Sequence, residues 1–108
     1  MRPNQNILDN LVRRIIAVVR PSRILLFGSA ARGDMQPDSD IDVLVIVPDG
    51  VHRRQTVRDI YRHLIGFPFA VDVVVATESD LSKYKDNFSL VYYPASREGQ
   101  EIYAAGPA

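Results

Sequence analysis

Apolar residues recur along the chain first at helical spacing and then at strand spacing. Between Ile7 and Val19 they are three and four positions apart, which predicts a helix that ends before Pro21. The same spacing predicts a second long helix from His52 to Ile65. Short runs rich in apolar residues predict strands between and after these helices, at Arg23–Phe27, Asp40–Val47 and Phe69–Val75.

The pattern is less regular toward the C-terminal end. Thr77 and Asp80 have the spacing of a capping box and predict the start of a short helix. Residues 88–97 are apolar enough for a further helix that Pro94 ends or kinks, and residues 100–103 predict a last strand. The elements together predict an α/β (α+β) fold with a small sheet flanked by helices.

Composition limits the size, location and partners of the protein. A chain of 108 residues, 46% of them hydrophobic, predicts a single domain over residues 1–108 with one core. Thirteen basic residues balance thirteen acidic ones, so bulk charge predicts no direct nucleic-acid partner. The chain has no cysteine, which excludes disulfides and thiolate metal sites. Without a secretory pattern at the start or an apolar run of membrane-spanning length, we expect a cytoplasmic protein with no membrane partner.

A turn and two acids form the pattern with the most chemical meaning. Gly28 and Ser29 follow the first predicted strand, and Asp40 and Asp42 open the second. Alternate strand residues point the same way, so these two carboxylates lie on one face with Cα atoms roughly 6.6 Å apart. Glycine permits a close backbone approach, and free N–H groups at a helix start attract phosphate oxygens. The pattern therefore predicts a site for a metal-bound nucleoside triphosphate.

Structural roles compete with this interpretation. Acids near a strand start often serve as turn or cap residues, and an ordinary helix start explains Ser29 equally well. Asp42 and Asp72 favour the functional interpretation, because each lies in an otherwise apolar run. A carboxylate placed among apolar side chains is costly without a cation or hydrogen-bond donors.

The motif resembles that of a known enzyme superfamily. The chain carries Gly28-Ser29, then ten further residues, then Asp40-x-Asp42. This spacing is similar to the signature of nucleotidyltransferases related to DNA polymerase β. The chain looks like their smallest members, the MNT proteins, which are often encoded as antitoxins beside a HEPN-domain toxin. The resemblance extends from about Ile7 to Tyr103. It implies the nucleotidyltransferase fold, with a small mixed β-sheet flanked by helices, and a third carboxylate at Asp72.

The resemblance also implies an activity and the roles of the site residues. It implies a protein adenylyltransferase that transfers AMP from ATP to a tyrosine of a HEPN ribonuclease toxin and so inactivates it. Asp40 and Asp42 would bind two Mg²⁺ ions, and Asp72 would complete the shell of one ion and accept the proton of the attacking hydroxyl. Gly28 and Ser29 would bind the β and γ phosphates through the backbone N–H groups and the hydroxyl.

The basic residues have competing interpretations. Arg32 is a candidate for neutralising phosphate or acceptor, but a surface ion pair with Asp34 or Asp38 explains it equally well. The helix over residues 52–65 carries several arginines, and a solvated face is favoured over contact with a partner or nucleotide. These arginines are Arg53, Arg54, Arg58 and Arg62.

Two other functions remain open at this stage. The chain could transfer a nucleotide to a small hydroxylated compound, with a homodimer building the acceptor pocket. It could also be a binding module that blocks its partner without turnover, because a motif alone does not establish activity. The expected assembly is accordingly either a hetero-oligomer with the toxin or a homodimer.

Overall fold

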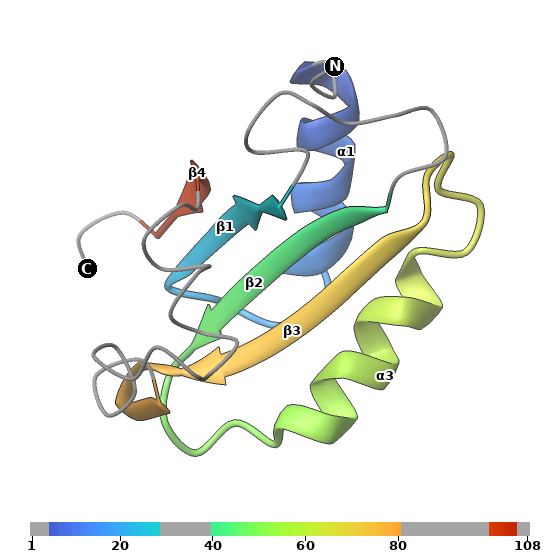
Figure 1. The fold of residues 1–108 in the computed structure, drawn as a ribbon. Coiled ribbons are helices and arrows are strands. Elements are labelled where there is room, and N and C mark those ends of the chain that lie inside the picture. Colours follow the sequence, from blue (N-terminus) through green and yellow to red (C-terminus); the bar gives the residue numbers. More distant parts are fainter. Residues whose placement is uncertain (1–4, 29–39, 81–99, 106–108) are drawn as a thin grey trace.

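The structure of this chain, a computed structural model, describes residues 5–28, 40–80 and 100–105. None of the helices in these ranges is long and apolar enough to cross a membrane. Figure 1 shows the helices beside a twisted sheet. In chain order the elements are α1 (Gln5–Ile16), β1 (Arg23–Phe27), β2 (Ile41–Val47), α3 (Arg53–His63), β3 (Val71–Thr77) and β4 (Gln100–Ala104).

The sheet is mixed, with the strand order β3-β2-β1-β4. β1 is antiparallel to both of its neighbours, β2 and β4. β2 and β3 are parallel, and α3 makes the crossover between them. Parallel neighbours need such a crossover, because a tight hairpin joins only antiparallel strands. The predicted α/β (α+β) fold with a small mixed sheet flanked by helices is confirmed.

Both long helices pack on one face of the sheet. Leu11 and Ile15 of α1 and Ile60 of α3 are fully buried against the odd-numbered residues of β2, which include Val43 and Val45. In Figure 1, α1 lies behind the sheet and α3 runs beside β3. We call this side the helix face. Burying each of these aliphatic side chains stabilises the fold by roughly 1.5–3 kcal/mol before the loss of chain entropy is subtracted.

The opposite face of the sheet carries a second apolar cluster. Leu25 of β1, Leu44 and Ile46 of β2, and Ala76 of β3 are buried there, with Phe27 and Val74 packed against them. The central strand is therefore apolar on both faces, in contrast to the one-sided alternation of a solvated sheet. We call this second side the acid face, because Asp42 follows the same alternation as Leu44 and Ile46.

An arginine of α1 fixes the C-terminal end of α3. The Arg14 guanidinium donates to the carbonyl oxygens of His63 at 2.8 Å and Ile65 at 3.0 Å. It also lies 5.7 Å from the centre of the Phe67 ring. A cation at a helix C-terminus binds carbonyls that lack helical partners and interacts favourably with the helix dipole.

Two predicted boundaries need correction. The first helix ends at Ile16, and the chain continues as a turn in which the Val18 and Val19 N–H groups donate to the Ile15 carbonyl. The third strand begins at Val71 instead of Phe69, because Gly66 (φ +87°) turns the chain and Pro68 has no N–H for a sheet. The predicted last strand is confirmed as β4. The helix expected at residues 88–97 lies outside the described residues.

The predicted capping box follows β3. The Asp80 N–H donates to the Thr77 hydroxyl at 3.0 Å, and the Thr77 N–H donates to the Asp80 carboxylate at 3.1 Å. Arg53, at the start of α3, pairs with the same carboxylate at 2.6 Å. The backbone hydrogen bond from Thr77, with a smaller contribution from Arg53, lowers the pKa of Asp80 from its usual 3.8. These contacts connect the start of α3 to the end of β3.

We expect Asp80→Ala to lower the free energy of unfolding by about 1 kcal/mol at neutral pH, because it removes the side chain that completes the capping box with Thr77. Because the pKa of Asp80 is lower in the folded state, its stabilising effect is complete above pH 3.8 and disappears as the pH falls through the folded-state pKa. Urea unfolding at several pH values measures this. The control Asp59→Asn, at a partly exposed position of α3 whose carboxylate contacts the solvated side chains of Gln55 and Arg62, should change stability by less than about 0.5 kcal/mol. Equal losses in both variants would contradict the capping role.

Candidate active site

Two of the predicted acids lie directly beside each other on adjacent strands. In the parallel register of β2 and β3, Asp42 is opposite Asp72. Neighbouring strands are about 4.8 Å apart, and residues opposite each other in register point to the same face. Asp42 is half-buried and Asp72 is exposed. Two carboxylates therefore converge on the acid face, near the amino-terminal ends of the parallel strands.

The pairing concentrates negative charge at one place on the sheet. Like charges directly opposite each other on neighbouring strands are destabilising. Within the described part of the chain, the Asp72 carboxylate has no hydrogen bond or ion pair. Its oxygens are therefore available to a ligand, and a divalent cation between Asp42 and Asp72 would remove their repulsion.

On its other side, Asp42 borders the end of β1. Asp42 is the register partner of Phe27 in the antiparallel pair of β1 and β2. Gly28 follows with a positive φ of +68°, where glycine has no steric penalty. A Cβ atom at position 28 would lie 2.4 Å from the Asp42 Oδ2 atom. Glycine at this position therefore allows the backbone to pass directly beside the carboxylate.

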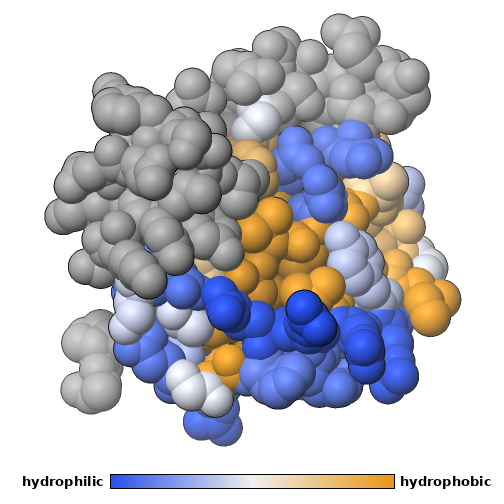
Figure 2. Space-filling model, turned by 60° about the horizontal axis from the view of Figure 1, so that its bottom comes forward, coloured by the Kyte–Doolittle hydropathy of each residue, from blue (hydrophilic) through white to orange (hydrophobic). Residues whose placement is uncertain are grey.

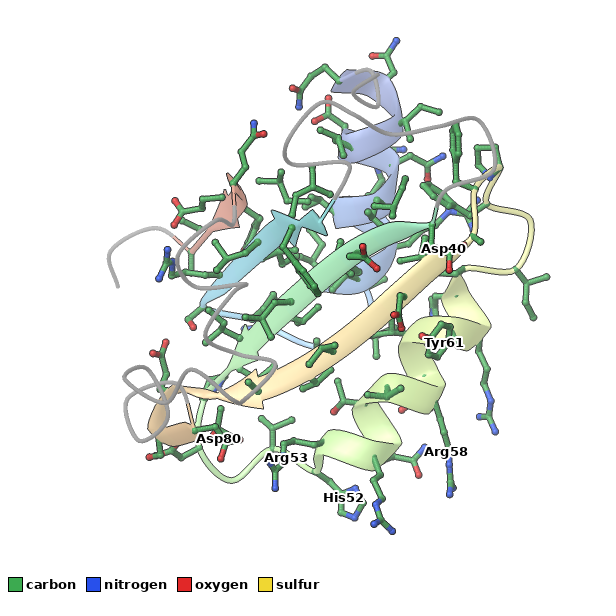
Figure 3. All side chains as sticks on the ribbon, in the orientation of Figure 1. Asp40, His52, Arg53, Arg58, Tyr61 and Asp80 are labelled. Carbon is green, nitrogen blue, oxygen red and sulfur yellow. The ribbon has the colours of Figure 1, made fainter. Side chains whose placement is uncertain are left out.

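Asp40 lies immediately before β2, two residues from Asp42, and is exposed. Figure 3 shows it at the upper end of β2, whereas Arg53 and Asp80 lie at the opposite, lower end of the molecule. The structure thus brings Gly28, Asp42 and Asp72 together and places Asp40 at the same end of β2. Ser29 and Arg32, the other predicted phosphate ligands, lie outside the described residues.

The structure does not test the predicted three-carboxylate metal site. Across residues 5–28, 40–80 and 100–105, no group of three or more acidic or histidine side chains is close enough to enclose a metal ion. Mg²⁺ does not require such a group, because it usually binds through one or two carboxylates together with substrate phosphates and water. The assignment of Asp40, Asp42 and Asp72 as metal ligands stays a prediction.

Tyr61 is a neighbour of the site whose position the sequence pattern did not indicate. The helical spacing groups Tyr61 with the core-facing residues of α3, but its side chain is 41% exposed. Its hydroxyl oxygen accepts a hydrogen bond of 3.0 Å from the Val73 N–H on the outer edge of β3. Tyr61 therefore fixes the strand edge one residue after Asp72. Only the three-dimensional path of α3 beside β3 reveals this contact.

Two of the four arginines of α3 form ion pairs, and the other two are exposed to solvent. Arg53 pairs with Asp80, and Arg62 lies 3.8 Å from Asp59 with its side chain 73% exposed. Arg54 and Arg58 are exposed as well. Figure 2, which brings the lower side of Figure 1 forward, shows hydrophilic residues gathered along the bottom of that view. These observations agree with a solvated face on α3.

Comparisons with known proteins give the family. The family model of the nucleotidyltransferase domain matches residues 8–102. The chain belongs to this family. The match includes Gly28 and all three predicted aspartates, so the residues that meet on the acid face lie within a nucleotidyltransferase domain. No match was found among curated proteins.

Solved structures show the same fold in other proteins. A toxin–antitoxin structure with AMP-PNP aligns with a TM-score of 0.65 and 17% identity, over 91% of this chain and 73% of the other. The MntA-HepT toxin–antitoxin structure aligns with a TM-score of 0.63 and 14% identity, over 94% of this chain and 74% of the other. At these identities the likeness establishes the shared fold.

The Gly28 geometry predicts a specific destabilisation. An alanine in a left-handed conformation costs about 1–2 kcal/mol, and at position 28 its Cβ would also collide with Asp42. We expect Gly28→Ala to lose more stability in urea unfolding than Gly50→Ala, the matched control. Gly50 also has a positive φ, of +93°, but a Cβ atom added there would meet nothing within 4 Å. Equal losses in the two variants would show that Asp42 does not restrict position 28.

Proposed function

We propose that this chain is a Mg²⁺-dependent nucleotidyltransferase that acts as an antitoxin, transferring AMP from ATP to a tyrosine of a HEPN-domain toxin. The observation that carries the proposal is the pairing of Asp42 with Asp72 next to Gly28. This arrangement combines ligands for a hard cation with a backbone that a phosphate can approach closely. The family match to nucleotidyltransferase domains supports the same chemistry.

The donor set suits magnesium. Asp42 and Asp72 would bind the cation with carboxylate oxygens, and Asp40 would add a further carboxylate from the start of β2. When bound with the triphosphate, Mg²⁺ neutralises phosphate charge and stabilises the charge that develops on the leaving pyrophosphate. The acids are close to solvent, since Asp40 and Asp72 are exposed. A large metal–nucleotide complex can therefore reach them.

The residues of the chain have distinct roles in the transfer. The tyrosine oxygen attacks the α-phosphorus of ATP, a new oxygen–phosphorus bond forms, and the bond to pyrophosphate breaks. In this proposal Asp72 accepts the proton that the tyrosine hydroxyl loses. Gly28 gives the triphosphate room beside Asp42, and Ser29 and Arg32 add phosphate contacts. The protein contributes mainly positioning and charge stabilisation, which dominate catalysis of phosphoryl and nucleotidyl transfer.

The proposed acceptor is supported by the complexes in which proteins of this fold are found. Chains of this fold occur in toxin–antitoxin structures, one of them with AMP-PNP, an ATP analogue. An acceptor outside the chain could reach the acids directly, because Asp40 and Asp72 are exposed to solvent. A tyrosine on a protein partner can approach the exposed Asp72 carboxylate more easily than it could approach a deeply buried one.

We expect ATP to raise the melting temperature in the presence of Mg²⁺ and to have little effect in EDTA. A ligand that binds only the native state stabilises it by about 2.7 kcal/mol at a hundredfold excess over its dissociation constant. Asp42→Asn and Asp72→Asn should remove the Mg²⁺-dependent shift while the apo proteins stay folded. Differential scanning fluorimetry measures all of these shifts.

The matched control for this experiment is Asp59→Asn, which removes a partly exposed carboxylate of α3 that lies outside the proposed site. It should retain the full shift with Mg²⁺ and ATP. Equal shifts of the melting temperature in Mg²⁺ and in EDTA would contradict the metal site. A Mg²⁺-dependent shift that is undiminished in both Asp42→Asn and Asp72→Asn would contradict it as well.

We expect incubation with the cognate toxin, ATP and Mg²⁺ to add one or more AMP groups to a toxin tyrosine. Asp72→Asn should reduce the rate of transfer more than it weakens nucleotide binding, because a proton acceptor acts mainly in the transition state. Intact-mass and peptide mass spectrometry detect the modification. A toxin that is bound and silenced without added mass would point to a non-catalytic antitoxin. A toxin that does not bind would point to a small hydroxylated acceptor.

A further inference from the structure

A hollow lies between α1 and β4, away from the acid face. Its volume is about 480 Å³. Apolar side chains from both elements line it, and an acidic and a basic residue of α1 complete its wall. The lining residues are Asp9, Val12, Arg13, Ile16, Ile102 and Tyr103.

A bulge in β4 supplies one wall of this hollow. Ile24 pairs with Tyr103 and Leu25 with Glu101, so the register skips Ile102. In a regular strand, consecutive side chains point to opposite faces, but Ile102 and Tyr103 both pack against the core on the helix face. The bulge therefore places two neighbouring apolar side chains on the same side of the strand.

The other wall is a second stripe along α1. Leu8, Leu11 and Ile15 form the buried stripe of this helix. The hollow is lined by a separate set at positions i, i+3, i+4 and i+7, the spacing of a helix face that packs on a partner. The members of this set are Asp9, Val12, Arg13 and Ile16. The Ile16 side chain is 40% exposed.

The two charges of this stripe do not pair within the monomer. Asp9 and Arg13 have the i, i+4 spacing of a favourable helical ion pair. Asp9 instead accepts a hydrogen bond of 2.8 Å from the Gln5 side chain. The Arg13 guanidinium has no hydrogen bond or ion pair in the part of the chain that the structure describes. One acid and one base, one helical turn apart, are thus available on an apolar surface.

We propose that this surface binds a second copy of this chain in a two-fold symmetric dimer. When two α1 helices pack antiparallel across a two-fold axis, the same patch contacts itself, and Asp9 of each copy faces Arg13 of the other. The pair thus forms twice, and Val12, which lies close to the two-fold axis, packs against its counterpart in the other copy. A patch with one positive and one negative charge is complementary to itself under this symmetry, whereas a patch of one sign would repel its own copy.

The dimer leaves the proposed catalytic residues accessible. α1 packs on the helix face, whereas Asp42 and Asp72 lie on the acid face. Each copy would therefore keep its own pair of carboxylates, with Asp72 exposed. The dimer does not depend on the proposed transferase function, and either one can fail without the other.

A charge-swap experiment tests the dimer. In sedimentation velocity over a range of protein concentrations, the wild-type chain should show a concentration-dependent dimer. Asp9→Arg and Arg13→Asp each convert two attractive pairs into two repulsive ones and should weaken dimerisation at least about tenfold. The double variant Asp9→Arg/Arg13→Asp restores two attractive pairs and should restore the dimer. Val12→Ser should weaken dimerisation by removing the apolar contact at the two-fold axis.

The control is Arg58→Asp, an equal charge reversal on the exposed side of α3, which should leave dimerisation unchanged. Circular dichroism confirms that each variant is folded, which we expect because Asp9 and Arg13 are exposed. The proposal is overturned if the wild-type chain stays monomeric at every concentration, if the single reversals do not weaken the dimer, or if the double variant does not restore it. A monomer that binds another protein through α1 would also overturn it.

Discussion

The site depends on the parallel register that sets Asp42 opposite Asp72. This register places two carboxylates on one face of the sheet at the spacing between neighbouring strands. A shift by one residue would send every side chain of β3 to the other face and put Asp72 on the helix face. The apolar residues of β3 hold this arrangement, because Val73 and Val75 pack in the helix-face cluster while Ala76 packs on the other side, the side of Asp72. The hydrophobic core thus determines where the charged pair lies.

β1 completes the site by bringing its end against β2. The antiparallel pairing sets Phe27 opposite Asp42, and the chain turns at Gly28 immediately afterwards. A side chain at position 28 would occupy the place of the Asp42 carboxylate. Gly28 and Asp42, which belong to two separate motifs of the sequence, are therefore neighbours in space. In the proposed function, a phosphate bound beside Gly28 would share a cation with the aspartates.

The sequence predicted the elements better than their arrangement. Apolar periodicity located all four strands within about two residues, because strands and helices follow local side-chain patterns. The acids were recognisable because Asp42 and Asp72 interrupt apolar runs. The pairing of Asp42 with Asp72, the contact of Tyr61 with Val73 and the bulge at Ile102 were not predictable, because they arise from the packing of distant segments. The start of β3 was placed too early because Phe69 and Ala70 are apolar but follow a proline.

A spatial measurement of the bound cation tests the central claim most directly. Mn²⁺ can replace Mg²⁺ at oxygen-rich sites, and its unpaired electrons broaden the NMR signals of nearby amides. Added with ATP, it should broaden the amide signals of Gly28, Asp42 and Asp72 and leave those of Arg53 and Asp80 sharp. Broadening centred on Arg53 and Asp80, or no localised broadening at all, would contradict a metal–nucleotide site at the paired aspartates.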